Sequence, residues 1–140
     1  DQLFCHTDSS GCSHLKGTSL RYAIDFNYGA ENDDLGYPVL AMAAGKVIYA
    51  TCSEPEPMVE HGTKSAGCMV ILSHSYSGAT DVERSRYMHL TTITVEVNDL
   101  VDQGQQIGVV GNTGNTKNTR SDGSTYYAAH IHVDVPSCLS

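Results

Sequence analysis

The stretch Pro38-Val-Leu-Ala-Met-Ala-Ala-Gly45-Lys-Val-Ile-Tyr-Ala-Thr51 decides the fold class. It contains two short β-prone runs, Pro38–Ala43 and Lys46–Thr51, on either side of an Ala44-Gly45 turn signal. No part of the chain shows an apolar stripe with the 3.6-residue period of a helix sustained over three turns. The sequence therefore favours strands joined directly to strands over a layout in which strands alternate with helices.

The same strand-and-turn pattern recurs along most of the chain. Asn112–Tyr126 is a long polar segment with glycines, and we expect it to be a mobile surface loop that borders a site. The fold class predicted is all-β, an antiparallel sheet or sandwich groove with long surface loops, formed by one domain over residues 1–140. The further strands predicted are Leu20–Phe26, Met69–His74, Arg84–Leu90, Thr92–Val97, Gln106–Val110 and His130–Val135.

Composition excludes two classes of partner. The net charge of −8 argues against nucleic acid, which attracts a surface rich in Lys and Arg. The longest apolar run, Tyr37–Ala44, has eight residues, whereas a membrane-spanning helix needs about 20. The chain begins at Asp1 rather than Met, and we expect that an export signal has been removed.

Five cysteines are more than a cytosolic protein of this size usually carries. Cys5–Cys12 and Cys52–Cys68 are the local pairs we expect, which leaves Cys138 odd. Each loop closure would contribute about 2–4 kcal/mol. The sequence has no C-x-x-C pair of the kind that zinc ribbons use, so disulfides and an oxidising, extracellular location are favoured.

The pair His130-Ile131-His132 lies on a predicted strand, where side chains two residues apart share a face. Ile131 and Val133 would then face the core. Two imidazoles side by side can form half of a metal site, in which one binds the ion and its neighbour handles protons. Taken alone, the pattern is more typical of histidines that are buried in a core or lie on a surface.

Two other polar residues interrupt apolar strands. Asp25 lies within Tyr22-Ala-Ile-Asp25-Phe, where a carboxylate is costly unless it is paired or metal-bound, although by itself it is more typical of a strand-end Asp that caps a turn. His89 lies within Tyr87-Met-His89-Leu and by itself is typical of a hydrogen-bonded core histidine. Together with His132, they could supply the N and O ligands that catalytic zinc takes while it keeps one position for water.

Several short motifs, in order from about Ser13 to Val135, resemble those of the M23 zinc metallopeptidases, the lysostaphin/LytM-like cell-wall endopeptidases. The long gap between His14 and Asp25 is closer to the LasA/β-lytic branch. The motifs are Ser13-His14 with Tyr22-Ala-Ile-Asp25-Phe, Pro38-Val-Leu-Ala-Met-Ala-Ala-Gly45-Lys-Val-Ile, Tyr87-Met-His89-Leu, Val101-Asp-Gln-Gly104-Gln-Gln-Ile-Gly108-Val-Val-Gly111-Asn-Thr-Gly114 and His130-Ile-His132-Val.

The resemblance implies roles for individual residues. One Zn²⁺ per chain would be held by His14, Asp25 and His132. His89 and His130 would be the catalytic histidines that do not bind the metal, His130 taking a proton from the zinc-activated water and His89 stabilising the oxyanion. His74 would be structural, and His6 is an alternative to His14. The implied fold is a groove in antiparallel sheet, of the duplicated hybrid-motif type.

The resemblance also implies a function. The chain would be a secreted, monomeric, antibacterial zinc endopeptidase that cuts peptidoglycan cross-links or stem peptides, with glycine-containing bonds preferred. Two departures bear on groove shape and substrate: Ala128-Ala129 stand where the family usually has Gly-Pro, and the Cys52–Cys68 insertion is absent from compact members.

Two alternatives remain. One keeps the fold without catalysis, as a module that binds cell wall or a receptor, although all five matching site positions are present here. The other is a lipoyl or biotinyl carrier or a sugar-phosphotransferase domain, which Val101–Gly114 also resembles. The carrier would need a lysine in its modified turn, and Lys46, Lys64 and Lys117 lie in other contexts; the phosphotransferase would be cytosolic, which the cysteines contradict.

Overall fold

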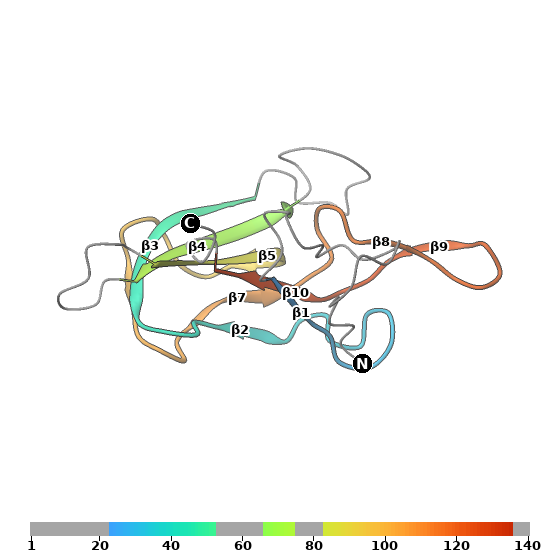
Figure 1. Ribbon diagram of the computed structural model, residues 1–140, viewed down its shortest axis with the longest axis horizontal. Helices are drawn as coiled ribbons and strands as arrows, with labels where there is room; N and C mark the ends of the chain where they lie inside the picture. The colour runs from blue at the N-terminus through green and yellow to red at the C-terminus, as the bar shows by residue number, and fades with distance from the viewer. Residues whose placement is uncertain (1–22, 53–65, 75–82, 136–140) are drawn as a thin grey trace.

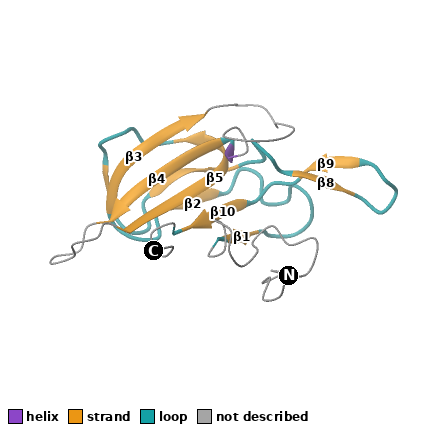
Figure 2. Cartoon of the chain, turned by 45° about the horizontal axis from the view of Figure 1, so that its top comes forward, coloured by secondary structure: helices purple, strands orange, loops and turns teal. Residues whose placement is uncertain are grey.

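The computed structural model describes residues 23–52, 66–74 and 83–135. These residues contain strands and loops but no α-helix, with only Ala66 in a 3₁₀ conformation (Figure 2). The all-β prediction is therefore confirmed. Within the described part of the chain, no helix is long and apolar enough to cross a membrane. The strands are β1 (Ile24–Phe26), β2 (Pro38–Leu40), β3 (Gly45–Cys52), β4 (Cys68–His74), β5 (Glu83–Ile93), β6 (Leu100–Val101), β7 (Gln106–Val110), β8 (Lys117–Thr119), β9 (Thr125–Tyr127) and β10 (Ile131–Asp134).

One antiparallel sheet of eight strands carries the molecule (Figure 1). Its main order is β1-β10-β5-β4-β3-β6. The long strand β5 belongs to two parts of this sheet. Its residues from Glu83 to Leu90 pair with β4 and, on the other edge, partly with β10, whereas its last residues pair with β7, which in turn pairs with β2. Strands β8 and β9 form a separate hairpin that projects from one end of the molecule (Figure 1).

The core follows from side-chain alternation along these strands. Strand β4 alternates buried and half-buried residues throughout, with Val70 and Leu72 fully buried. On β10, Ile131 and Val133 pack against the core, as predicted, while His132 and Asp134 face the other side. An apolar cavity of about 280 Å³ lies on the Val133 side, so polar chemistry is confined to the opposite face of β10.

Three predicted elements differ from the structure, the first being Pro38–Ala43, where strand β2 ends at Leu40. Thr92–Val97 is not a strand of its own: β5 continues through Ile93 past a bulge, and Asn98 then adopts a positive φ of 83° in a turn. Asn112–Tyr126 is not simply a loop, because all but the last residue of the β8–β9 hairpin, which is paired from Lys117 to Tyr127, lies within it. Gly123, with φ of 84°, permits the tight turn at its tip.

The predicted Cys52–Cys68 disulfide is present. The two residues are direct cross-strand partners at the ends of β3 and β4, so pairing and disulfide reinforce the same register. Cys68 is fully buried and Cys52 is exposed. The other three cysteines (Cys5, Cys12, Cys138), together with His6, His14, His61 and the start of the predicted strand Leu20–Phe26, lie outside the described residues.

Candidate active site

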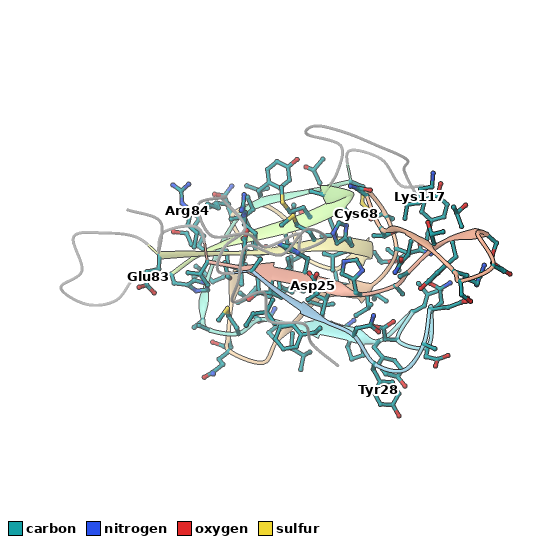
Figure 3. The ribbon with its side chains drawn as sticks, turned by 45° about the vertical axis from the view of Figure 1, so that its right-hand side comes forward. Asp25, Tyr28, Cys68, Glu83, Arg84 and Lys117 are labelled. Carbon is teal, nitrogen blue, oxygen red and sulfur yellow. A yellow bond between two sulfur atoms is a disulfide. The ribbon has the colours of Figure 1, made fainter. Side chains whose placement is uncertain are left out.

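Asp25 and His132 face each other across the β1–β10 pair (Figure 3 labels Asp25). Direct cross-strand partners share a face, so the carboxylate and the imidazole project together. Asp25 Oδ1 lies 2.7 Å from His132 Nδ1. His132 is 5% exposed, whereas the Asp25 side chain is 39% exposed, so a buried nitrogen and an accessible oxygen meet at one point.

His89 reaches the same place because β5 is irregular there. Tyr87 and Leu90 both point into the core, so two residues, Met88 and His89, stand between core positions where regular alternation allows one. Opposite them the register of β4 shifts by one, and His89 itself has φ of 65°. A non-glycine residue in this left-handed region is strained, and such strain is concentrated at functional sites.

A glycine brings the third histidine close. Gly111 accepts a hydrogen bond from His130 N–H, at 3.2 Å, and on its other side a Cβ would lie 2.8 Å from His89 O and 2.3 Å from Thr91 N. Because Gly111 has no side chain, β5 and His130 can approach across it. The ring centroids of His89 and His130 are 4.6 Å apart, and those of His89 and His132 are 6.0 Å apart.

Backbone carbonyls fix the tautomers of two rings. His89 Nδ1 lies 2.9 Å from Thr113 O and His130 Nδ1 lies 3.1 Å from Ala128 O. A carbonyl can only accept, so each Nδ1 carries the hydrogen and, in the neutral ring, each Nε2 carries a lone pair. Burial, with the nearby His130 charge second, lowers the pKa of His89 to about 3, so this ring is neutral across the physiological range.

The donor set suits zinc. Zinc takes histidine nitrogen and carboxylate oxygen as ligands, and Asp25 Oδ1 and His132 Nδ1 bring one of each together, 2.7 Å apart in the hydrogen bond that joins them. No three metal-binding side chains converge within the described part of the chain. His14, which is predicted as the third ligand, lies outside that part.

Sequence reasoning missed an ion pair beside the site. Arg86 and Asp134 are cross-strand partners on β5 and β10, and the guanidinium donates to both carboxylate oxygens, with Nε to Oδ1 at 2.6 Å. Asp134 is 2% exposed and lies on the His132 face of β10. An arginine within Glu83-Arg-Ser-Arg86-Tyr and an aspartate after the H-x-H motif were visible signals, but only the strand register shows that they meet.

His74 supports the structural role predicted for it. It is buried, and its ring nitrogens are each 2.8 Å from a partner, Ala44 O and Ser85 Oγ. Ser85 Oγ in turn lies 3.1 Å from the hydroxyl of Tyr87, which accepts a hydrogen bond from Met42 N–H. This polar chain ties β4 and β5 to the end of β2.

A cleft opens beside the histidines. It has a volume of about 410 Å³ and is lined by Asp25, Asn27, residues 115–118, Ala128 and His130. Figure 3 shows Asp25 over the central strands and Lys117 where the projecting hairpin begins. Asparagine side chains line the walls, and amides can donate to and accept from a peptide backbone.

The profile of peptidase family M23 matches residues 19–136, which is most of the chain. The chain belongs to the M23 peptidase family. No curated protein sequence is significantly similar to it. This M23 peptidase is 30% identical to the catalytic domain of the antimicrobial peptidase lysostaphin from Staphylococcus simulans, with a TM-score of 0.57, over 82% of this chain and 67% of that domain.

Two other solved structures are similar. A zinc-containing peptidase from Vibrio cholerae is 27% identical, with a TM-score of 0.55, over 81% of this chain and 26% of that one. An M23 peptidase described as putative, from Pseudomonas aeruginosa, is 26% identical, with a TM-score of 0.57, over 91% and 40%. This chain thus spans much less than the whole of these two relatives, and 40% of a longer lysostaphin chain from Staphylococcus simulans.

Proposed function

We propose that this M23 peptidase is a secreted zinc endopeptidase that hydrolyses peptide bonds in bacterial peptidoglycan. The observation that carries the proposal is the convergence of Asp25 and His132, 2.7 Å apart, with the rings of His89 and His130 beside them. Family membership supports a metallopeptidase. The Cys52–Cys68 disulfide supports an oxidising, extracellular location.

Asp25 and His132 would hold the zinc, with His14 as the third protein ligand. When bound, zinc acts as a Lewis acid that activates a water molecule for attack on a peptide carbonyl. The cleft beside it would receive the substrate as an extended chain, with Asn27, Asn115 and Asn118 available to pair with its amides. We expect the scissile bond to contain glycine, because a residue without a side chain fits closest to the histidine rings.

The Nδ1 hydrogen bonds of His89 and His130 predict different roles for these two histidines. His130 Nε2 carries a lone pair, so it can take a proton from the attacking water and pass it to the leaving amine. His89 has a pKa of about 3 and is a poor base at neutral pH, but its Nε2 can accept a hydrogen bond and orient that water. An Nε2 without hydrogen cannot donate to an oxyanion, so this role replaces the one expected from the sequence.

Metal content tests the ligand assignment. Asp25→Ala and His14→Ala should each reduce bound zinc, measured per chain by atomic emission, and abolish hydrolysis. Asp102→Ala, at an exposed position in the β6–β7 turn, is the matched control and should retain both zinc and turnover. If Asp25→Ala binds zinc as tightly as the wild type does, Asp25 is not a ligand.

Turnover tests the roles of the non-ligand histidines. His89→Ala and His130→Ala should retain zinc while kcat falls by about 10²–10⁴. Zymography on bacterial walls, with and without chelator, establishes the activity itself, and mass spectrometry of the released muropeptides identifies the bond. Binding to walls without release of any fragment would contradict the proposal and leave a binding module.

A further inference from the structure

His89 depends on one backbone carbonyl for its orientation. The residue lies in the β5 bulge with a strained φ of 65°, and its side chain is buried with Nδ1 on Thr113 O. The strand alone does not direct this ring toward the site, because regular alternation would send it into the core. Whatever fixes the position of the Thr113 carbonyl therefore fixes the imidazole.

Thr113 is itself held from two sides through its hydroxyl. Oγ1 accepts a hydrogen bond from Cys68 N–H at 2.9 Å and donates one to Leu90 O at 2.7 Å. Thr113 is 2% exposed, so both bonds are shielded from water. The hydroxyl thus joins the first residue of β4 to the residue that follows His89.

The backbone of residues 67–68 closes tightly on Thr113. A Cβ on Gly67 would lie 2.3 Å from Thr113 Oγ1 and 2.5 Å from its carbonyl carbon, and Gly67 has φ of 62°. The next residue, Cys68, is fully buried and linked to Cys52 on β3. Figure 3 shows Cys68 at the end of the sheet that faces the hairpin. The backbone that packs against Thr113 is therefore fixed to both β3 and β4.

We propose that Thr113 is a positioning residue for His89, and that it acts through a clamp formed by Gly67, Cys68 and Thr113. The clamp places the Thr113 carbonyl so that His89 keeps its hydrogen on Nδ1 and presents the Nε2 lone pair to the site. The consequence for turnover rests on the role proposed above for His89. The structural part, which concerns the tautomer and orientation of the ring, does not depend on it.

Two substitutions separate the hydroxyl from the shape of the side chain. Thr113→Val keeps the volume and the backbone carbonyl but leaves Cys68 N–H and Leu90 O without their partner. Thr113→Ser keeps the hydroxyl and loses a methyl group. We expect kcat to fall about 10- to 100-fold in Thr113→Val, less than the loss of about 10²–10⁴ on removing a catalytic histidine, with KM and zinc content within about twofold of wild type. Thr113→Ser should restore most of the loss.

The readout independent of activity is the tautomer of His89, measured by ¹⁵N NMR on histidine-labelled, zinc-free protein at neutral pH. Wild type should show the Nδ1–H form alone, and Thr113→Val a mixture of the two forms. Thr116→Val is the matched control, since Thr116 is another buried threonine whose hydroxyl donates to a carbonyl, that of Asn112, at 2.8 Å. It should leave the His89 signals unchanged.

The outcomes are distinct. An Nε2–H tautomer in the wild type overturns the proposal without any variant, even if Thr113→Val fails to fold. So does a folded Thr113→Val protein with wild-type kcat and wild-type His89 signals. If the wild type hydrolyses no wall polymer but His89 still responds to Thr113→Val and not to Thr116→Val, the peptidase proposal fails and the clamp stands.

Discussion

Two arginine–carboxylate pairs of the same geometry flank the site, and they differ in their exposure to water. Arg86 and Asp134 form the inner pair, on the face of β5 and β10 that carries His132, with Asp134 2% exposed. Arg120 and Glu31 form the outer pair, which ties the hairpin to the loop before β2, with side chains 38% and 43% exposed. In both pairs the guanidinium contacts both carboxylate oxygens.

The difference in exposure predicts different roles for the inner and outer pairs. A buried charge that loses its partner has no water to replace it, so the inner pair holds β5 and β10 in one register beside the histidines. An exposed pair gains little and is screened by salt, so the outer pair biases the position of a wall without locking it. The comparison predicts that β5 and β10, which carry the histidines, form a rigid floor of the site. It also predicts that the hairpin and the loop before β2 form an adjustable wall of the substrate cleft.

The largest effect is expected from breaking the inner pair. Arg86→Leu leaves the Asp134 carboxylate buried and unpaired, and the free energy of unfolding should fall by about 3 kcal/mol. Denaturant unfolding of the zinc-free protein measures it. The double variant Arg86→Leu/Asp134→Leu is the control and should recover much of the loss. If the single variant is as stable as wild type, the inner pair is no stronger than a surface pair and the comparison breaks.

Acid should lower the free energy of unfolding through His89. Burial lowers its pKa to about 3, whereas in the unfolded chain the pKa is about 6.5. Between these values the unfolded chain takes up a proton that the folded protein does not, so His89 lowers the free energy of unfolding as pH falls from 6.5 toward 3. The slope is at most about 1.4 kcal/mol per pH unit, or about 2 kcal/mol by pH 5.

Unfolding of the zinc-free protein in chelator, as a function of pH, tests this sign. Other groups also titrate in this range, so the measured quantity is the difference in slope between wild type and His89→Gln. A shallower acid slope in the variant is expected. Equal slopes would show that His89 is accessible to protons in the folded state.

Much of the fold could be read from the sequence because local signals determined it. Alternation of apolar residues and glycine turns fixed the run from Pro38 to Thr51, which the structure forms as β2 and β3. The hairpin within Asn112–Tyr126 was hidden by its polar composition, since its stability depends on the Gly123 turn and on pairing rather than on burial.

The site was visible in part for a related reason. His132 and Asp25 could be grouped from motifs, and their facing arrangement needed only the strand register. The bulge that turns His89 toward the site, and the Thr113 hydroxyl that holds it, depend on contacts between β4, β5 and the segment after β7. No local pattern encodes such a contact, so Thr113 appeared in the sequence only as one letter of a longer motif.

The smallest effect on stability is expected from breaking the outer pair, whose main effect should be on KM for the substrate. Arg120→Gln removes the bidentate contact with Glu31 and the stacking of the guanidinium 4.6 Å above the Tyr126 ring, yet the denaturant midpoint of unfolding should stay close to that of wild type, because both side chains are exposed. Because the hairpin and the loop before β2 border the cleft, KM should rise severalfold while kcat is retained.

Salt should raise KM of the wild type by screening the same pair and should affect Arg120→Gln less. Glu31→Gln, which breaks the pair from the other side and keeps the stacking of Arg120 on Tyr126, is the control and should raise KM and weaken its salt dependence in the same direction as Arg120→Gln. A fall in kcat with KM unchanged would instead place the outer pair with the floor, and the division between a rigid floor and an adjustable wall would be wrong.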